Sequence, residues 1–320
     1  MSRPCVVVTR QPPGDAVDRI AAVAEVRLWT EDVPMPGDLL RSWIRDAEGL
    51  YCMLTDRIDA GLLDAAPRLR VISQMAVGVD NIDLDACRDR GIPVGHTPDV
   101  LTESTADLAM ALVLAAARRL EEGTEHVRSG AWGPWQPDLL LGRDVHGTTM
   151  GIVGLGRIGA AVARRATGFG MAIRYCGPRR KPELEERLGA EYRSLDELLG
   201  EADHVVVTAP LTDHTRHLID ARALRAMKPT AVLVNVARGP LVDPDALVRA
   251  LTEGWITAAG LDVTEPEPIP PDHPLVGLPN CTILPHVGSG TVATREAMAS
   301  LAADNLLAGL AGRPLPASIG

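Results

Sequence analysis

A glycine-rich turn between an apolar run and a helical pattern limits the fold more than any other part of this sequence. Gly154, Gly156 and Gly159 have the spacing G-x-G-x-x-G, and the apolar residues 149–153 directly precede them. The first glycine permits a tight turn, the second lets a pyrophosphate approach the backbone, and the third lets the following helix pack on the strand. Free N–H groups at the start of that helix favour an anion. We therefore predict a dinucleotide-binding strand–turn–helix unit, with a tight turn that binds nothing as the alternative; its other residues are Leu155, Arg157 and Ile158.

Short apolar runs alternate with helical patterns along most of the chain, which predicts βαβ units and parallel sheets. The runs lack strict alternation, as expected for strands buried on both faces. The pattern changes near residues 96–101, and a second alternating series begins at residue 148. We predict an α/β fold of two Rossmann-like domains whose parallel sheets are flanked by helices. The expected strands are 5–9, 48–55, 71–75, 93–95, 149–153, 172–175, 204–208, 231–236, 257–261 and 282–284, and the expected helices are 16–24, 103–120, 158–168 and 292–311.

Composition narrows the class of protein. A length of 320 residues favours two domains, and 46% hydrophobic residues suffice for a packed core. The net charge of −10 disfavours a nucleic-acid partner, and no apolar run approaches the roughly 20 residues of a membrane span. The cysteines are odd in number and never in C-x-x-C spacing, which predicts reduced thiols in a cytoplasmic protein without a metal site. They are Cys5, Cys52, Cys87, Cys176 and Cys281.

The segment after the expected strand 172–175 bears on the choice of dinucleotide. An acidic residue about 20 positions after the glycine turn commonly binds the ribose 2′-hydroxyl, yet no Asp or Glu lies between Gly159 and Pro182. Arg179, Arg180 and Lys181 stand there instead. Their charges favour a 2′-phosphate, so we expect NADP(H) as the preferred cofactor, with NAD(H) still possible. A solvated basic loop is the alternative.

Polar residues follow three further strands, where ligands of an open α/β sheet bind. Arg238 follows the run 231–236, and its planar fork suits a carboxylate and a neighbouring carbonyl. Asp262, Glu265 and Glu267 follow the next strand, and His286 follows the last. We expect the other nearby histidines to be surface or turn residues; they are His204, His214, His217 and His273.

Four segments together resemble the D-isomer-specific 2-hydroxyacid dehydrogenases. They are GLGRIG at 154–159, NVARGPLVD at 235–243, GLDVTEPEP at 260–268 and ILPHVGS at 283–289. Three further segments resemble the glyoxylate/hydroxypyruvate reductase branch of this family: VISQMAVGVDNID at 71–83, HTPDVLTESTADLA at 96–109 and DVTEPEPIPPDHPL at 262–275. The resemblance implies a substrate-binding lid domain of residues 1–100 completed by 289–320. It also implies a dinucleotide-binding domain of residues 101–288 with a dimerisation segment at about 103–142.

The resemblance also implies roles for single residues. Arg238 would bind and polarise a keto acid, and His286 would protonate its carbonyl oxygen. Glu267 would orient His286 and favour its charged form, a role for which Glu265 is a poorer match. Backbone N–H groups of the loop 76–78, at Val77 and Gly78, would bind the substrate carboxylate. The implied cofactor contacts outside the glycine turn are Thr105, Pro210, Val236, Asp262 and Gly288.

The segment 103–142 also predicts a homodimer, because it holds more apolar surface than a small loop buries alone. The resemblance implies that Trp135, or else Trp132, reaches the active site of the partner subunit. The other apolar residues of this argument are Leu108, Leu112, Leu114 and 139–141.

These features together predict NAD(P)H-dependent reduction of a small 2-keto acid, such as glyoxylate or hydroxypyruvate, to the D-2-hydroxy acid. One alternative is a larger 2-keto acid such as 2-ketogluconate. Another is a dinucleotide-sensing corepressor of the same fold. Formate oxidation is disfavoured, because formate dehydrogenases of this family have Gln where Glu267 stands.

Overall fold

The computed structural model describes residues 3–319 and divides the chain into two compact units. The first unit runs to Leu101 and resumes at Ser289, and the second is Thr102–Gly288. Each unit is built on one largely parallel sheet flanked by helices, so the predicted α/β class with two parallel-sheet domains is confirmed.

The sheet of the first unit has the strand order β13-β5-β4-β3-β1-β2, and only β13 pairs antiparallel within it. Every residue of β1, β3 and β4 is buried, as the unbroken apolar runs predicted. The strands are β1 (Cys5–Val8), β2 (Glu25–Leu28), β3 (Gly49–Cys52), β4 (Val71–Gln74), β5 (Val94–Gly95) and β13 (Ser318–Ile319). The helices are α1 (Ala16–Ala21), α2 (Gly37–Trp43), the 3-10 helix η1 (Ile44–Asp46), α3 (Ala60–Asp64), α4 (Leu84–Asp89) and α12 (Val292–Leu310).

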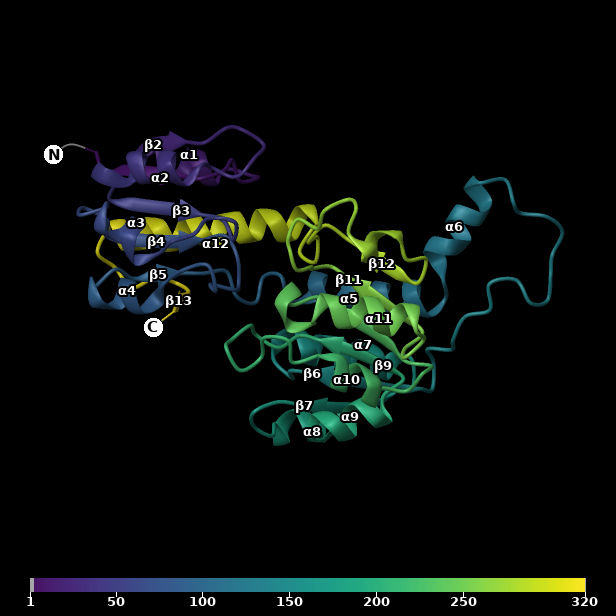
Figure 1. Cartoon of the computed structure of the whole chain (residues 1–320). Coiled ribbons are helices and arrows are strands. Elements are labelled where there is room, and N and C mark those ends of the chain that lie inside the picture. The colour runs from purple at the N-terminus through teal and green to yellow at the C-terminus, as the bar shows by residue number, and fades with distance from the viewer. Residues whose placement is uncertain (1–2, 320) are drawn as a thin grey trace. The chain divides into compact units, whose positions relative to one another are not determined.

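The long C-terminal helix α12 packs on β3 and β4 of the first unit (Figure 1). Tyr51 donates its hydroxyl hydrogen bond to the carbonyl of Ala299 at 3.2 Å, and Ser73 donates to that of Ala302 at 2.7 Å. A Cβ on Gly309 would lie 2.4 Å from a methyl group of Val71, so only glycine permits this close approach. The two ends of the chain therefore share one hydrophobic core.

The sheet of the second unit is parallel throughout, in the order β12-β11-β10-β9-β6-β7-β8. Its strands are β6 (Thr149–Val153), β7 (Ala172–Cys176), β8 (Ala190–Tyr192), β9 (His204–Val207), β10 (Val232–Asn235), β11 (Ala258–Leu261) and β12 (Cys281–Ile283). The α-helices are α5 (Thr102–Ala117), α6 (Leu120–Arg128), α7 (Arg157–Gly168), α8 (Pro182–Leu188), α9 (Leu195–Glu201), α10 (Ala221–Ala226) and α11 (Pro244–Thr252), and the 3-10 helices are η2 (Gly239–Leu241) and η3 (Pro274–Gly277).

The helix expected over 103–120 is α5 in the structure, and a second, shorter helix that the sequence analysis did not predict follows it. Helix α5 ends at Ala117, because Arg119 adopts the left-handed conformation (φ 53°), and α6 starts at Leu120. Leu112 is 2% exposed and packs in the core of the second unit, with its Cβ close to Gly260. Its use in the dimer argument is therefore wrong, whereas Trp132, Trp135 and Leu141 are exposed. Helix α6 and the segment after it extend away from the sheet of their unit (Figure 1).

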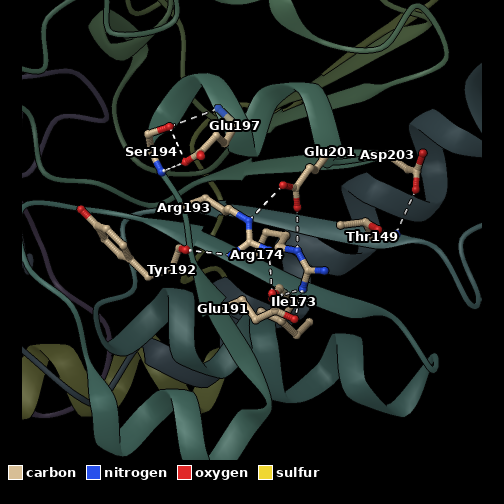
Figure 2. A network of polar contacts seen from close by, with 10 residues as sticks. All are labelled: Thr149, Ile173, Arg174, Glu191, Tyr192, Arg193, Ser194, Glu197, Glu201 and Asp203. Atoms are coloured by element: carbon tan, nitrogen blue, oxygen red, sulfur yellow. Dashed lines mark hydrogen bonds and ion pairs between the residues drawn. The ribbon is translucent and has the colours of Figure 1, made fainter.

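Two arginines and two glutamates form a network of ion pairs that joins the outer strands β7 and β8 of the second sheet to α9 (Figure 2). Arg174 of β7 contacts Glu201 at 2.8 Å and Glu191 at 2.9 Å. Arg193 contacts the same two carboxylates at 3.0 and 2.6 Å. Hydrogen bonds from Arg174 and Arg193 hold the pKa of Glu201 below its ordinary value. The shared carboxylates join β7, β8 and α9 beside the loop that follows β7.

His204 contradicts the expectation of a surface or turn position. It opens β9 between β6 and β10 and is 1% exposed. Its Nε2 donates to the carbonyl of Asp144 at 3.2 Å, and burial lowers its pKa. It is a neutral core residue because a central strand leaves its side chain no route to solvent.

All five cysteines are buried and unpaired. Between residues 3 and 319, the structure contains no helix with the length and apolarity needed to cross a bilayer.

Candidate active site

The strands of the second sheet run in one direction, so their carboxyl ends meet at one edge, and the segments after them carry most of the predicted site residues. The glycine turn follows β6, and the basic segment follows β7. Arg238, Asp262 and His286 follow β10, β11 and β12, which are neighbours in the sheet. Pro210 lies exposed after β9, and Val236 lies buried after β10.

The glycine turn shows why two of its glycines are required. Gly154 has φ 99°, and a Cβ there would lie 2.7 Å from the backbone nitrogen of Ala209. A Cβ on Gly159 would lie 2.3 Å from the carbonyl oxygen of Gly154. Gly156, by contrast, is exposed at the start of α7 with no atom within 4 Å of its Cβ position. This open space beside a helix N-terminus fits a pyrophosphate.

The basic segment after β7 is only partly available to a ligand. Arg180 forms two hydrogen bonds to Glu185, at 3.1 and 2.6 Å, and Glu185 also accepts one from the hydroxyl of Tyr175 at 2.6 Å. The hydrogen bonds from Arg180, and to a smaller extent the one from Tyr175, lower the pKa of Glu185 to about 2. Arg179 is exposed and makes no ion pair with any residue in 3–319. Arg180 is thus paired with Glu185, whereas the Arg179 side chain is available to a ligand.

His286 and Glu267 lie in contact, which is the pairing that the family resemblance implied. The distance from His286 Nδ1 to Glu267 Oε1 is 2.5 Å, and both side chains remain partly exposed. A carboxylate only accepts hydrogen bonds, so Nδ1 carries a proton and Nε2 is the ring nitrogen left for another partner. His286 adopts φ 54°, a left-handed conformation uncommon for residues other than glycine.

Glu265, two residues from Glu267, has a separate set of partners. It accepts hydrogen bonds from Arg216 and, at 2.8 Å, from Nε2 of His217. Burial alone would raise the pKa of Glu265, but the hydrogen bonds from His217 and Arg216 outweigh it and lower the pKa. Glu265 therefore holds the turn at 212–217 against the loop that carries Glu267, and Glu267 alone of the two contacts His286.

Asp262 organises the backbone around His286. Its side chain is 1% exposed and accepts hydrogen bonds from the N–H groups of Val287 and Gly288, both at 2.7 Å. Its carbonyl accepts the N–H of His286 at 2.8 Å. Burial raises the pKa of Asp262, and the two backbone hydrogen bonds oppose that rise. A Cβ on Gly288 would lie 2.9 Å from Asp262 Oδ2 and 3.3 Å from Thr105 Cγ2, so these three residues gather at one point.

The turn that carries Arg238 depends on two residues that the sequence analysis did not single out. Asn235, buried at the end of β10, donates to the carbonyl of Arg238 at 2.8 Å and accepts the N–H of Ala237 at 3.1 Å. A Cβ on Gly239 would lie 1.9 Å from the carbonyl oxygen of Thr264. The segment leading to Glu267 therefore lies directly against the Arg238 turn. An amide residue that ends a buried strand just before the arginine was the available signal.

The remaining predicted residues do not belong to the loops that follow the strands of the second sheet. Val77 and Gly78 follow β4 in the first unit and are half-buried. Trp135 is 84% exposed in the segment after α6, and Trp132 is also exposed.

Comparison with known proteins extends these observations to the whole chain. The family model described as D-isomer specific 2-hydroxyacid dehydrogenase, NAD binding domain, matches residues 110–288. The chain is 51% identical over 310 residues to a glyoxylate reductase of Thermococcus kodakarensis, covering 96% of this chain and 93% of that protein. It is 49% identical over 320 residues to a glyoxylate reductase of Aeropyrum pernix, covering 99% and 96%.

Two solved structures are similar over nearly their whole length. The TT0316 protein from Thermus thermophilus is 50% identical with a TM-score of 0.93, covering 99% of this chain and 100% of that one. An NADPH-dependent glyoxylate/hydroxypyruvate reductase from Sinorhizobium meliloti, in complex with NADP and malonate, is 35% identical with a TM-score of 0.88, covering 100% and 97%. With the matched sequence and the shared architecture taken together, this chain belongs to the D-isomer-specific 2-hydroxyacid dehydrogenase family.

Proposed function

We propose that this protein reduces glyoxylate or a similarly small 2-keto acid to the D-2-hydroxy acid with NAD(P)H. The observation that carries the proposal is the 2.5 Å contact between His286 and Glu267, at the sheet edge that also presents Arg238 and the glycine turn. Relatives named glyoxylate reductases, at about half identity over nearly the whole chain, support it. The same relatives disfavour a dinucleotide-sensing corepressor, and Glu267 disfavours formate oxidation.

Each residue has a distinct role in the proposed reaction. A nicotinamide cofactor, whose pyrophosphate the glycine turn at Gly154, Gly156 and Gly159 would hold, would supply the hydride that C2 of the keto acid accepts. The Arg238 guanidinium binds the substrate and polarises its carbonyl, and Nε2 of His286 donates a proton to the carbonyl oxygen. Glu267 accepts a hydrogen bond from Nδ1 and so fixes the histidine tautomer. The N–H groups of Val77 and Gly78 bind the substrate carboxylate.

A steady-state assay tests the proposal. We expect glyoxylate or hydroxypyruvate to give the highest kcat/KM in a panel that also contains pyruvate and 2-ketogluconate, with NADPH and NADH each supplied. Absence of turnover with every 2-keto acid would contradict the reductase function. A preference for 2-ketogluconate would instead assign a larger substrate.

Cofactor choice is the next prediction, and we expect a preference for NADPH of about tenfold or more. A charge-assisted pair with a phosphate contributes about 1.5–3 kcal/mol, and no Asp or Glu lies between Gly159 and Pro182 to repel the phosphate. Arg179→Ala should remove most of the preference, measured as the ratio of kcat/KM for the two cofactors. Arg180→Ala should have a smaller effect, because Glu185 already pairs with that side chain. Equal efficiency of the wild-type enzyme with NADH would contradict the prediction.

We also propose a twofold homodimer. Trp132, Trp135 and Leu141 expose apolar side chains on the segment after α6, as residues of a subunit interface would. Light scattering at micromolar concentration should give about twice the mass of one chain, and a monomeric mass would contradict the dimer. If Trp135 reaches the partner's site, Trp135→Ala should change the ranking of substrates more than the affinity for NADPH.

Glu267→Gln is expected to lower kcat/KM for glyoxylate. The Glu267 carboxylate can only accept a hydrogen bond, so it keeps a proton on Nδ1 of His286 and leaves Nε2 for the substrate. The amide of glutamine can also donate a hydrogen bond, so the variant no longer fixes one tautomer of the ring. Glu265→Gln is the matched control and should leave kcat/KM nearly unchanged, because Glu265 contacts Arg216 and His217 instead. An unchanged kcat/KM in Glu267→Gln would show that Glu267 does not position His286.

We assign the protein to the cytoplasm. Its five cysteines are buried and unpaired, as is usual in reducing compartments. Its net charge of −10 argues that neither nucleic acid nor an anionic membrane surface is a partner.

A further inference from the structure

Three successive carbonyl groups in the loop after β4 are held by hydrogen bonds from within the first unit. The carbonyl of Ala76 accepts the N–H of Thr97 at 2.9 Å. The carbonyl of Val77 lies 3.0 Å from Nδ1 of His96, and that of Gly78 accepts from Nε2 of Gln74 at 2.6 Å. Two of the three donors are the side chains of His96 and Gln74, to which the proposed reaction assigns no role.

Because the peptide groups are planar, these contacts also determine where the N–H groups of the loop point. In a trans peptide, the carbonyl of one residue and the N–H of the next point in opposite directions. The bond from His96 to the Val77 carbonyl therefore directs the N–H of Gly78 away from His96. The bond from Gln74 to the Gly78 carbonyl does the same for the N–H of Val79. No residue between 3 and 319 accepts a hydrogen bond from the N–H of Val77, Gly78 or Val79.

Gln74 is itself held in a single orientation. It is fully buried, and its amide pairs with that of Asn81: Nε2 of Gln74 lies 2.7 Å from Oδ1 of Asn81, and Oε1 accepts from Nδ2 at 2.8 Å. Nδ2 of Asn81 also donates to the carbonyl of Asp56 at 2.7 Å. Backbone carbonyls only accept, so both amide nitrogens must face them, and neither amide can be flipped.

His96 is fixed through its backbone. Its carbonyl accepts from Nδ2 of Asn305 at 2.9 Å, and its N–H donates to the carbonyl of Ala317 at 3.1 Å. The preceding Gly95 permits this, since a Cβ there would lie 2.6 Å from Asn305. The Val77 carbonyl only accepts, so the neutral ring must carry its proton on Nδ1.

We propose that His96 and Gln74 are positioning residues for the carboxylate of the 2-keto acid: they hold the carbonyls of Val77 and Gly78, so that the N–H groups that follow these carbonyls, those of Gly78 and Val79, are fixed in orientation before an anion binds. Successive backbone N–H groups can form an anion site, and preorganisation removes the free-energy cost of turning peptides during binding. The proposal rests on the function proposed above, because it assumes that this loop binds the substrate carboxylate.

Two polar substitutions at one position test the role of His96. In His96→Asn the amide nitrogen stands near the place of Nδ1, and in His96→Gln it stands near that of Nε2. We expect His96→Gln to raise the KM for glyoxylate about tenfold and to weaken competitive inhibition by oxalate by the same factor. The kcat and the KM for NADPH should change less than about twofold. His96→Asn should restore most of the wild-type KM.

Gln74→Met provides an independent test, because methionine has nearly the same length but no amide. It should also raise the KM for glyoxylate and weaken inhibition by oxalate. The matched control is Ser73→Ala, which removes a buried hydrogen bond from the neighbouring residue to α12 without touching the loop. The control should lower the melting temperature and leave the KM for glyoxylate unchanged. If Gln74→Met does not fold, the two His96 variants decide the question.

The outcomes separate this proposal from the proposed function. A wild-type enzyme that turns over no 2-keto acid contradicts the proposed function. An active wild-type enzyme whose His96→Gln variant keeps its KM for glyoxylate overturns the positioning role alone. A loss confined to kcat would also overturn it, because it would place His96 in the chemical step rather than in binding.

Discussion

His286→Asn should lower kcat for glyoxylate reduction by about 10²–10⁴-fold, the usual contribution of a positioned proton donor. Asparagine is a better test than alanine, because His286 adopts φ 54° and asparagine tolerates the left-handed region. The backbone contacts of this loop with Asp262 should then survive. The loss should be larger than that of Glu267→Gln, which keeps the imidazole ring.

Fluorescence titration with NADPH and a melting curve serve as controls for the His286 variant. Both should stay close to wild type, since neither Nε2 nor the contact with Glu267 holds the fold together. Turnover above about a tenth of the wild-type value would contradict the assignment of His286 as the proton donor.

Arg238→Ala should lower kcat and raise the KM for glyoxylate together, with kcat/KM falling by about 10²–10³-fold. The guanidinium is assigned both to binding and to polarising the carbonyl, so both constants should respond. Alanine adds no backbone strain, because Arg238 is extended (φ −143°, ψ 140°). Arg238→Lys should recover only part of the loss, since an ammonium lacks the planar fork.

Measurements of kcat and KM would also show whether Arg238 lacks one of its two proposed roles. A rise in KM with unchanged kcat would restrict the residue to substrate binding. The affinity for NADPH, measured separately, should not change; if it falls to the same extent, the loss reflects a disturbed turn after β10 rather than a missing guanidinium.

Much of the architecture follows from local patterns in the sequence. Unbroken apolar runs predicted β1, β3, β4 and the strands of the second sheet other than β8, because strands buried on both faces need no polar positions. The runs missed β2 and β8, whose charged and half-exposed residues lie at sheet edges. The sequence analysis also placed the end of α5 at residue 120 rather than Ala117 and did not predict α6, since no rule of propensity predicts a left-handed conformation at Arg119.

The site shows the same division. The residue types and their places after strands pointed to Arg238, Glu267 and His286, because ligands bind at the carboxyl ends of parallel strands. The sequence left Glu265 as a weaker alternative to Glu267. The structure separates them, since Arg216 and His217 occupy Glu265 while Glu267 contacts His286.

The sequence by itself determined the α/β class, the glycine turn and the set of polar residues at the sheet edge, because strand burial and turn geometry depend on neighbouring residues in the chain. Only the tertiary structure decided which side chains meet. It paired Arg180 with Glu185, buried His204 and directed His96 and Gln74 to the carbonyls of Val77 and Gly78. Such contacts join residues distant in the sequence or turn on a single backbone conformation, and neither leaves a periodic trace in the sequence.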